Sequence, residues 1–146
     1  MIMNVITYGI QIYANNDIKR LQNLTDKILG IIGFTTDKEK IAQLKSENNI
    51  LNIENYNRLE WIKLAHDIIY NHKNLPEYYK KLFEINQGRN GIIINTKYRK
   101  SKYGDKISYN IMENIWNKLE INQRKIQDKY TFINNINSVI KKIIIT

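Results

Sequence analysis

The sequence has no cysteine, which excludes disulfide bonds, thiolate metal ligands and a cysteine nucleophile. It has one proline, Pro76, and six glycines, so little interrupts long helices and most breaks fall at Asn, Asp and Gly. No apolar run approaches the ~20 residues that span a bilayer. The apolar start also lacks the basic region and cleavage site of a signal peptide. We therefore expect no membrane association and an intracellular location, cytoplasmic or nuclear.

Residue patterns that support catalysis are missing as well. The sequence has no adjacent pair of aspartates, no glycine-rich phosphate loop ending in Gly-Lys and no Gly-x-Ser-x-Gly motif. Its two histidines, His66 and His72, are six residues apart, which is not the i, i+4 spacing of metal ligands on one helix face. We expect His66 to lie in an interface or at the core edge, and we expect no enzymatic activity, no cofactor and no metal site.

Positive charge is distributed unevenly along the chain, whose net charge is +9. Residues 1–73 contain 9 Lys and Arg against 8 Asp and Glu, whereas residues 74–146 contain 14 against 6. Clustered cations release counterions from phosphates and steer association with polyanions. The competing explanation is an AT-rich coding sequence, which would favour Lys (18 residues) over Arg (5). Codon bias does not explain why the excess is confined to one half.

Hydrophobic periodicity predicts helices over most of the chain. The first predicted element is an apolar helix or extended segment at 3–14, followed by an amphipathic helix capped by Asp17 and ended by Gly30 and Gly33. A short helix with a capping box of Thr36 and Glu39 comes next, and a long helix is predicted at 53–73. Pro76 opens another helix, and helical stripes follow at 109–120 and 131–144. We expect an all-α fold, a compact bundle of about five to seven helices in a single domain, 1–146. Trp61 and Trp116 lie beside apolar helix faces and should pack in the core.

Residues 88–108 interrupt this helical pattern. They combine three glycines, the β-branched run at 92–94 and a basic turn, which predicts one irregular basic loop or a short hairpin. Cations and tyrosines alternate within residues 97–109. The candidate nucleic-acid or anion-binding residues are Arg89, Lys97, Tyr98, Arg99, Lys100, Lys102, Tyr103 and Lys106.

Two interpretations of this basic pattern remain open. The cations would contact phosphates while tyrosines stack on bases, an interaction of about 1 to 3 kcal/mol per base in single-strand binders. Alternatively, the segment is an exposed loop whose tyrosines pack back onto the domain. The residue types alone fit both.

Three stretches, in collinear order, resemble the thumb and post-thumb C-terminal region of non-LTR (LINE-type) retrotransposon reverse transcriptases. The matching residues are Tyr8, Gly9, Tyr13, Leu21, Gln22, Lys27, Ile28, Leu29 and Ile32 in the first stretch, Pro76, Tyr78, Leu82 and Phe83 in the second, and Tyr103, Gly104, Lys106, Ile115, Trp116, Asn117, Leu119 and Phe132 in the third. The resemblance implies a thumb-like segment at 1–35 and post-thumb-like helices at 36–146, with the basic insertion at 88–108.

The third stretch also departs from the family pattern. Two family prolines are replaced by Glu113 and Glu120, and a Ser-Phe pair is replaced by Ile107 and Ser108. The catalytic palm of these polymerases holds two Mg²⁺ ions through an Asp-Asp turn, which this chain lacks. The resemblance therefore implies a fragment standing alone, without inherited DNA synthesis.

The leading hypothesis is a non-enzymatic protein that binds DNA or RNA in a sequence-tolerant way. The alternative is a captured viral or selfish-element interaction module that binds a host protein or a small anionic ligand, such as a nucleotide or cyclic dinucleotide. A homodimer is possible, and a cleft at its subunit boundary would favour the small phosphate ligand. A third possibility is a degraded reading frame with a residual fold.

Overall fold

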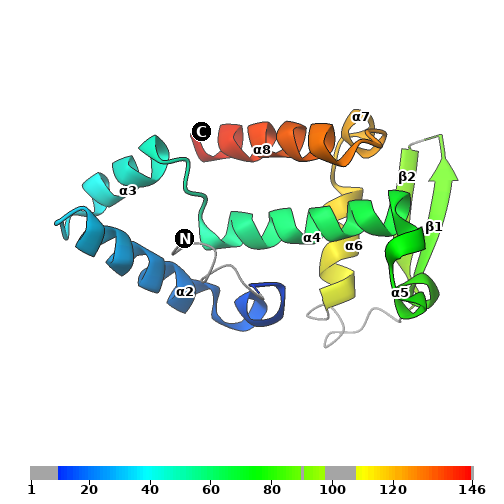
Figure 1. The fold of residues 1–146 in the computed structure, drawn as a ribbon, viewed down its shortest axis with the longest axis horizontal. Coiled ribbons are helices and arrows are strands. Elements are labelled where there is room, and N and C mark those ends of the chain that lie inside the picture. Colours follow the sequence, from blue (N-terminus) through cyan, green and yellow to red (C-terminus); the bar gives the residue numbers. More distant parts are fainter. Residues whose placement is uncertain (1–9, 90, 98–107, 146) are drawn as a thin grey trace. The chain divides into compact units, whose positions relative to one another are not determined.

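A computed structural model describes residues 10–89, 91–97 and 108–145 of the chain (Figure 1). Its elements are α2 (Ile10–Ile32), α3 (Lys38–Glu47), α4 (Ile53–Tyr70), the 3₁₀ helix η1 (His72–Asn74), α5 (Glu77–Leu82), β1 (Phe83–Gly88), β2 (Gly91–Thr96), α6 (Ser108–Asn117), α7 (Ile121–Arg124) and α8 (Lys129–Ile145). The protein is mostly helical, as predicted, but the two strands form an antiparallel sheet. The fold is therefore not purely all-α, and the short hairpin, one of the two alternatives expected around residues 88–108, is present. Within the described ranges, no helix has the length and apolar character needed to cross a membrane.

The chain divides into two compact units, Met1–Asn57 and Arg58–Thr146. The division falls inside α4, whereas the sequence resemblance places a boundary after residue 35, within unit 1. Each unit has its own buried apolar residues. The two are described separately below as unit 1 and unit 2.

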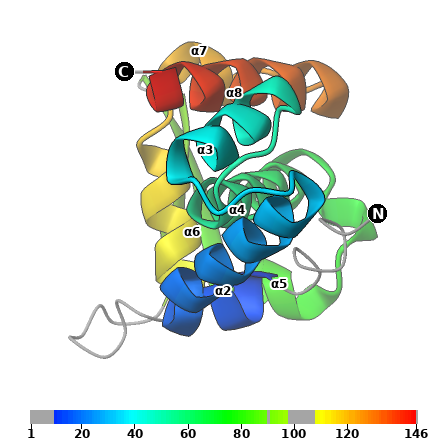
Figure 2. The ribbon, with the colours of Figure 1, turned by 90° about the vertical axis from the view of Figure 1, so that its left-hand side faces the viewer.

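Unit 1 is built from α2, α3 and the start of α4 (Figure 2). Ile10 and Ile53 form its buried centre, and partly buried apolar side chains surround them: Ile18, Leu21, Ile28 and Tyr56. The Gln22 side-chain oxygen accepts a hydrogen bond from the Ile53 backbone N–H at 2.9 Å, which ties α2 to the start of α4. Asp17 has non-helical dihedrals, φ −134° and ψ 31°, so α2 is kinked where the sequence predicts a helix start.

The turn between α2 and α3 requires glycine. A Cβ atom at Gly30 would lie 2.6 Å from the backbone oxygen of Thr35, and one at Gly33 would collide with the Leu44 side chain. The predicted capping box of Thr36 and Glu39 is wrong, because Asp37 caps α3. Its carboxylate accepts from the Glu39 N–H at 3.0 Å. Asp is an equally good N-cap, and the turn puts it one residue closer to the helix.

Unit 2 contains most of α4, together with α5 to α8 and the hairpin. Figure 1 shows α8 running alongside α4. Between them the ring of His66 stacks on Phe132 with centroids 4.4 Å apart, and Phe132 contacts Trp116 at 5.7 Å. Trp116 and Phe132 are fully buried and Trp61 is 4% exposed, which confirms the expected core positions of both tryptophans.

The hairpin begins earlier than residues 88–108. Strand β1 pairs antiparallel with β2 from Phe83 opposite Thr96 to Gly88 opposite Gly91. Residues 83–86 continue the apolar pattern of the helix opened by Pro76, so the sequence predicts that this helix runs to residue 86. The alternation of Phe83 and Ile85 also fits a strand, and pairing with the β-branched residues of β2 decides between the two.

Candidate nucleic-acid interface

One face of α6 supplies polar side chains to the outer edge of β2. Asn110, Glu113 and Asn117 are spaced three and four residues apart, so they line one side of the helix. Glu113 accepts hydrogen bonds from the backbone N–H of Thr96 at 2.9 Å and from its hydroxyl at 2.8 Å. Asn117 accepts from the Ile94 N–H at 3.1 Å and donates to the Ile94 carbonyl at 2.9 Å.

The carbonyl of Ile92 also points to the outer edge of β2. It accepts hydrogen bonds from the Trp116 indole N–H at 3.0 Å and from the Arg124 guanidinium at 3.2 Å. Side chains therefore take the place of a third strand along this edge. Unpaired buried backbone groups are costly, so these contacts fix α6 against the hairpin.

This arrangement joins the two ends of the basic segment, which we define as residues 97–106. The Thr96 hydroxyl and the Asn110 side-chain oxygen lie 2.9 Å apart, and Glu113 contacts the same hydroxyl. Just after Thr96, the Lys97 N–H donates to the Leu82 carbonyl at 3.1 Å. The chain thus leaves the hairpin and re-enters α6 at one fixed point on unit 2.

The structure describes two of the eight candidate binding residues. Arg89 is exposed in the turn between the strands, and Lys97 is exposed immediately after β2. The other candidates lie outside the described residues: Tyr98, Arg99, Lys100, Lys102, Tyr103 and Lys106. Arg89 and Lys97 stand at opposite ends of a six-residue strand, which spans about 20 Å. A single hairpin therefore does not bring these two cations together.

The net charge differs more between the two units than between the two halves of the sequence. Unit 1 contains 6 Lys and Arg against 6 Asp and Glu, whereas unit 2 contains 17 against 8. The whole net charge of +9 therefore belongs to unit 2. Lys63 and Lys129 are in ion pairs with Glu60 and Asp67. The other exposed cations of the described part of unit 2 are Arg58, Lys73, Lys81, Arg89, Lys97, Lys118 and Lys125.

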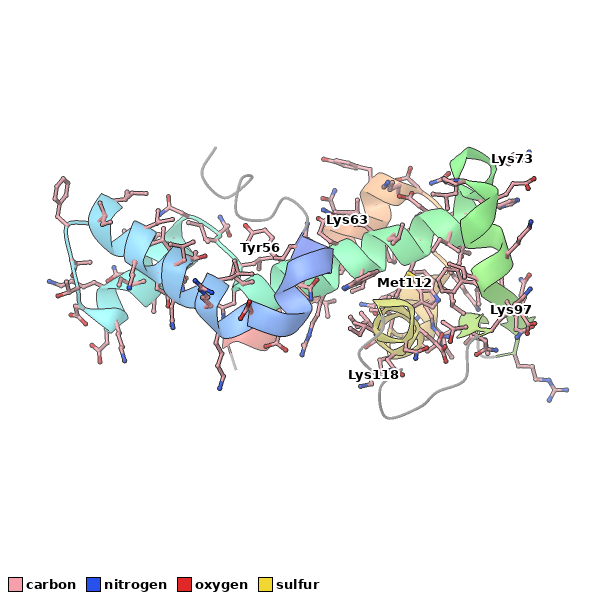
Figure 3. All side chains as sticks on the ribbon, turned by 90° about the horizontal axis from the view of Figure 1, so that it is seen from below. Tyr56, Lys63, Lys73, Lys97, Met112 and Lys118 are labelled. Atoms are coloured by element: carbon pink, nitrogen blue, oxygen red, sulfur yellow. The ribbon has the colours of Figure 1, made fainter. Side chains whose placement is uncertain are left out.

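These exposed cations do not all face the same way. In Figure 3, Lys97 and Lys118 lie on one side of α4 and Lys73 lies on the other. Lys97 and Lys118 both flank the hairpin and α6, the elements that hold the ends of the basic segment. Lys97 belongs to that segment, whereas Lys118 follows the end of α6 opposite to Asn110, so an interface centred on the segment would include Lys97 first.

The two histidines have different surroundings. His66 is fully buried, and its Nε2 lies 3.0 Å from the Ile126 carbonyl, while its Nδ1 is buried with no hydrogen-bond partner. Burial lowers the pKa of His66, so the ring is neutral and donates from Nε2. His72 is exposed in η1. Within the described ranges, no cluster of His, Asp and Glu is suited to hold a metal ion.

Two more polar side chains near His66, those of Tyr70 and Asp128, make hydrogen bonds at the connection from α7 to α8. The Tyr70 hydroxyl donates to the Arg124 carbonyl at 2.6 Å, and burial raises the pKa of Tyr70. Asp128 precedes α8, and hydrogen bonds from the Thr131 hydroxyl and N–H lower the pKa of its carboxyl. Both contacts hold the connection from α7 to α8 in place, so the surroundings of His66 are structural.

Sequence reasoning missed the role of Asn110, Glu113 and Asn117. Their signal was available, because polar residues at this spacing on the side of Trp116 must find partners if that side is buried. The resemblance to reverse transcriptases includes Trp116 and Asn117, which here contact β2, but that ancestry stays a prediction. No known family model matches the chain, and neither the curated proteins nor the solved structures include a significant match.

Proposed function

We propose that this chain is a non-enzymatic nucleic-acid-binding protein that contacts phosphates through Arg89 and the basic segment. It derives, on this proposal, from a fragment of a LINE-type reverse transcriptase without the catalytic palm. The observation that carries the proposal is the confinement of the whole net charge to unit 2. A uniform compositional bias would charge both units, whereas a polyanion interface needs the charge on one.

The position of the basic segment supports the same proposal. The residues that flank it, Thr96 and Asn110, are in contact, and the segment between them contributes five cations to unit 2. Such a concentration of charge suits the phosphate backbone, which carries no sequence information, so binding should depend little on base sequence.

The test is a binding panel with single- and double-stranded DNA and RNA, together with a nucleotide and a cyclic dinucleotide, at low and physiological salt. Affinity for duplex should fall with log salt with a slope of about 0.9 per phosphate neutralised. Reversing Lys97, Arg99, Lys100 and Lys102 to Glu should abolish binding.

The matched control reverses Lys19, Lys27, Lys38 and Lys40, all exposed residues of unit 1. Both variants have the same net charge of +1, because each reversal removes two charges from +9. The control should keep most of its affinity. Equal losses in the two variants, or no binding at low salt, would contradict the proposed interface. Tight, salt-insensitive binding of the cyclic dinucleotide alone would favour a small-ligand protein.

A further inference from the structure

Strand β1 has an outer edge that nothing in the described part of unit 2 covers. Glu84 to Gly88 are all exposed, and Ile85 is 44% exposed (Figure 1). The strand register and the hydrogen bond from the Lys97 N–H to the Leu82 carbonyl show which backbone groups of β1 point toward β2 and which point outward. Residues 82, 84 and 86 direct their backbone groups at β2, so Ile85 and Gln87 direct theirs outward.

We propose that two copies of this chain associate through β1, in antiparallel register about a two-fold axis at Asn86. In that register the outward groups of Ile85 pair with those of Gln87 of the partner subunit, and the reverse pair forms by symmetry. Four backbone hydrogen bonds result. The sheet becomes four-stranded, in the order β2, β1, β1, β2.

The sequence of β1 is self-complementary in this register. Its one charged residue, Glu84, lies opposite Gly88 of the partner subunit, and Asn86 lies opposite Asn86 of the partner subunit. Like charges placed directly opposite each other would oppose pairing, and here there are none. The strand also lacks the lysines and prolines that commonly protect exposed edges.

The covered edge of β2 explains why a second copy is the fitting occupant. Side chains of α6 and Arg124 occupy the outward groups of Ile92, Ile94 and Thr96. The sheet can therefore grow on the β1 side alone. Pairing of two such sheets leaves no open edge for a third copy, so the product is a closed dimer.

The dimer would also unite the two described candidate cations. Because the two β1 strands are antiparallel, the turn end of one hairpin lies beside the open end of the other. Arg89 then shares an end of the sheet with Lys97 of the partner subunit, although the two are about 20 Å apart within one chain. Each end of the four-stranded sheet would carry one such pair, suited to a bridging phosphate.

The dimer is tested without nucleic acid, so the result does not depend on the proposed function. The apparent mass of the full chain, followed by sedimentation at rising concentration, should move from 17.4 kDa toward twice that value. Because both copies are positively charged, added salt should strengthen the dimer while it weakens nucleic-acid binding. A chain that stays monomeric at high concentration and high salt overturns the proposal.

Substitutions at the two-fold axis test the register. Asn86→Lys and Asn86→Asp should each be monomeric, because like charges then face each other, whereas a mixture of the two should form a heterodimer. Ile85→Pro should also be monomeric, because it removes an outward N–H and leaves the bonds to β2 intact. The control is Asn114→Lys, at an exposed residue of α6, which should dimerise like the wild type. Dimerisation of Asn86→Lys alone, or a mixture no better than its components, would contradict the register.

Discussion

The side-chain amide of Asn117 hydrogen-bonds to both backbone groups of Ile94, accepting from its N–H at 3.1 Å and donating to its carbonyl at 2.9 Å. Ile94 is fully buried in the middle of β2. The Asn117 amide thus makes the two backbone hydrogen bonds to Ile94 that a neighbouring strand would otherwise make. It also couples residues 23 positions apart in the sequence.

Replacing Asn117 by Leu should destabilise unit 2 strongly. Two buried backbone groups would lose their partners, and each such loss costs about 1 to 3 kcal/mol. We expect the free energy of unfolding, measured by urea denaturation, to fall by about 2 to 4 kcal/mol. Asn114→Leu is the control on the same helix, because Asn114 is exposed. Equal losses in the two variants would mean that the loss of stability comes from placing Leu on this helix and not from the lost contacts between Asn117 and Ile94.

The helices could be predicted from the sequence because their signals are local. The long helix expected at 53–73 is α4 at Ile53–Tyr70 followed by η1, and Pro76 directly precedes α5. Apolar residues recurring every three or four positions and a proline at a helix start act within one or two turns.

The hairpin and its supports could not be predicted in the same way. Its outer edge is satisfied by Glu113, Trp116 and Asn117, which are 17 to 24 residues away from their partners in β2. Residues 83–88 fit a helix end as well as a strand, and pairing with β2, which these distant contacts hold in place, favours the strand. Of the candidate binding residues, Arg89 and Lys97 could be placed by residue type as exposed cations, but their separation depends on the hairpin.

Gly30→Ala should destabilise unit 1. An added Cβ would lie 2.6 Å from the Thr35 backbone oxygen, which cannot move without opening the turn. Overpacking of this kind costs about 1 to 3 kcal/mol, partly offset by the ~1 kcal/mol preference of Ala over Gly in helices. We expect a net loss of about 1 to 2 kcal/mol in thermal unfolding. Gly88→Ala, where the Cβ would meet nothing within 4 Å, should leave stability nearly unchanged.

Phe34→Asn should stabilise unit 1. Phe34 is 97% exposed and has φ 49°, a left-handed conformation that bulky side chains disfavour. The other non-glycine residue with positive φ among the described residues is Asn49, at 54°, which is the residue type that tolerates it. Because Phe34 buries almost nothing, its removal should raise the free energy of unfolding by about 0.5 to 1 kcal/mol. A decrease would mean that Phe34 makes contacts in solution, such as with a second protein.

Unfolding of the chain should become easier below neutral pH because of His66. Burial lowers the folded-state pKa below 6.5, so the unfolded state binds more protons as the pH falls. The stabilisation is fully present above about pH 6.5 and is lost as the pH falls through the folded pKa. Asp67, Asp128, Lys129 and Tyr70 surround the ring, and the two carboxylates only partly oppose the lowering of the His66 pKa.

Urea denaturation between pH 7.5 and 5 should therefore show that the free energy of unfolding falls with a slope of up to about 1.4 kcal/mol per pH unit. His66→Gln should flatten this slope whatever its effect on stability at pH 7.5, whereas His72→Gln, at an exposed residue, should not. An unchanged slope in His66→Gln would assign the pH dependence to the carboxylates.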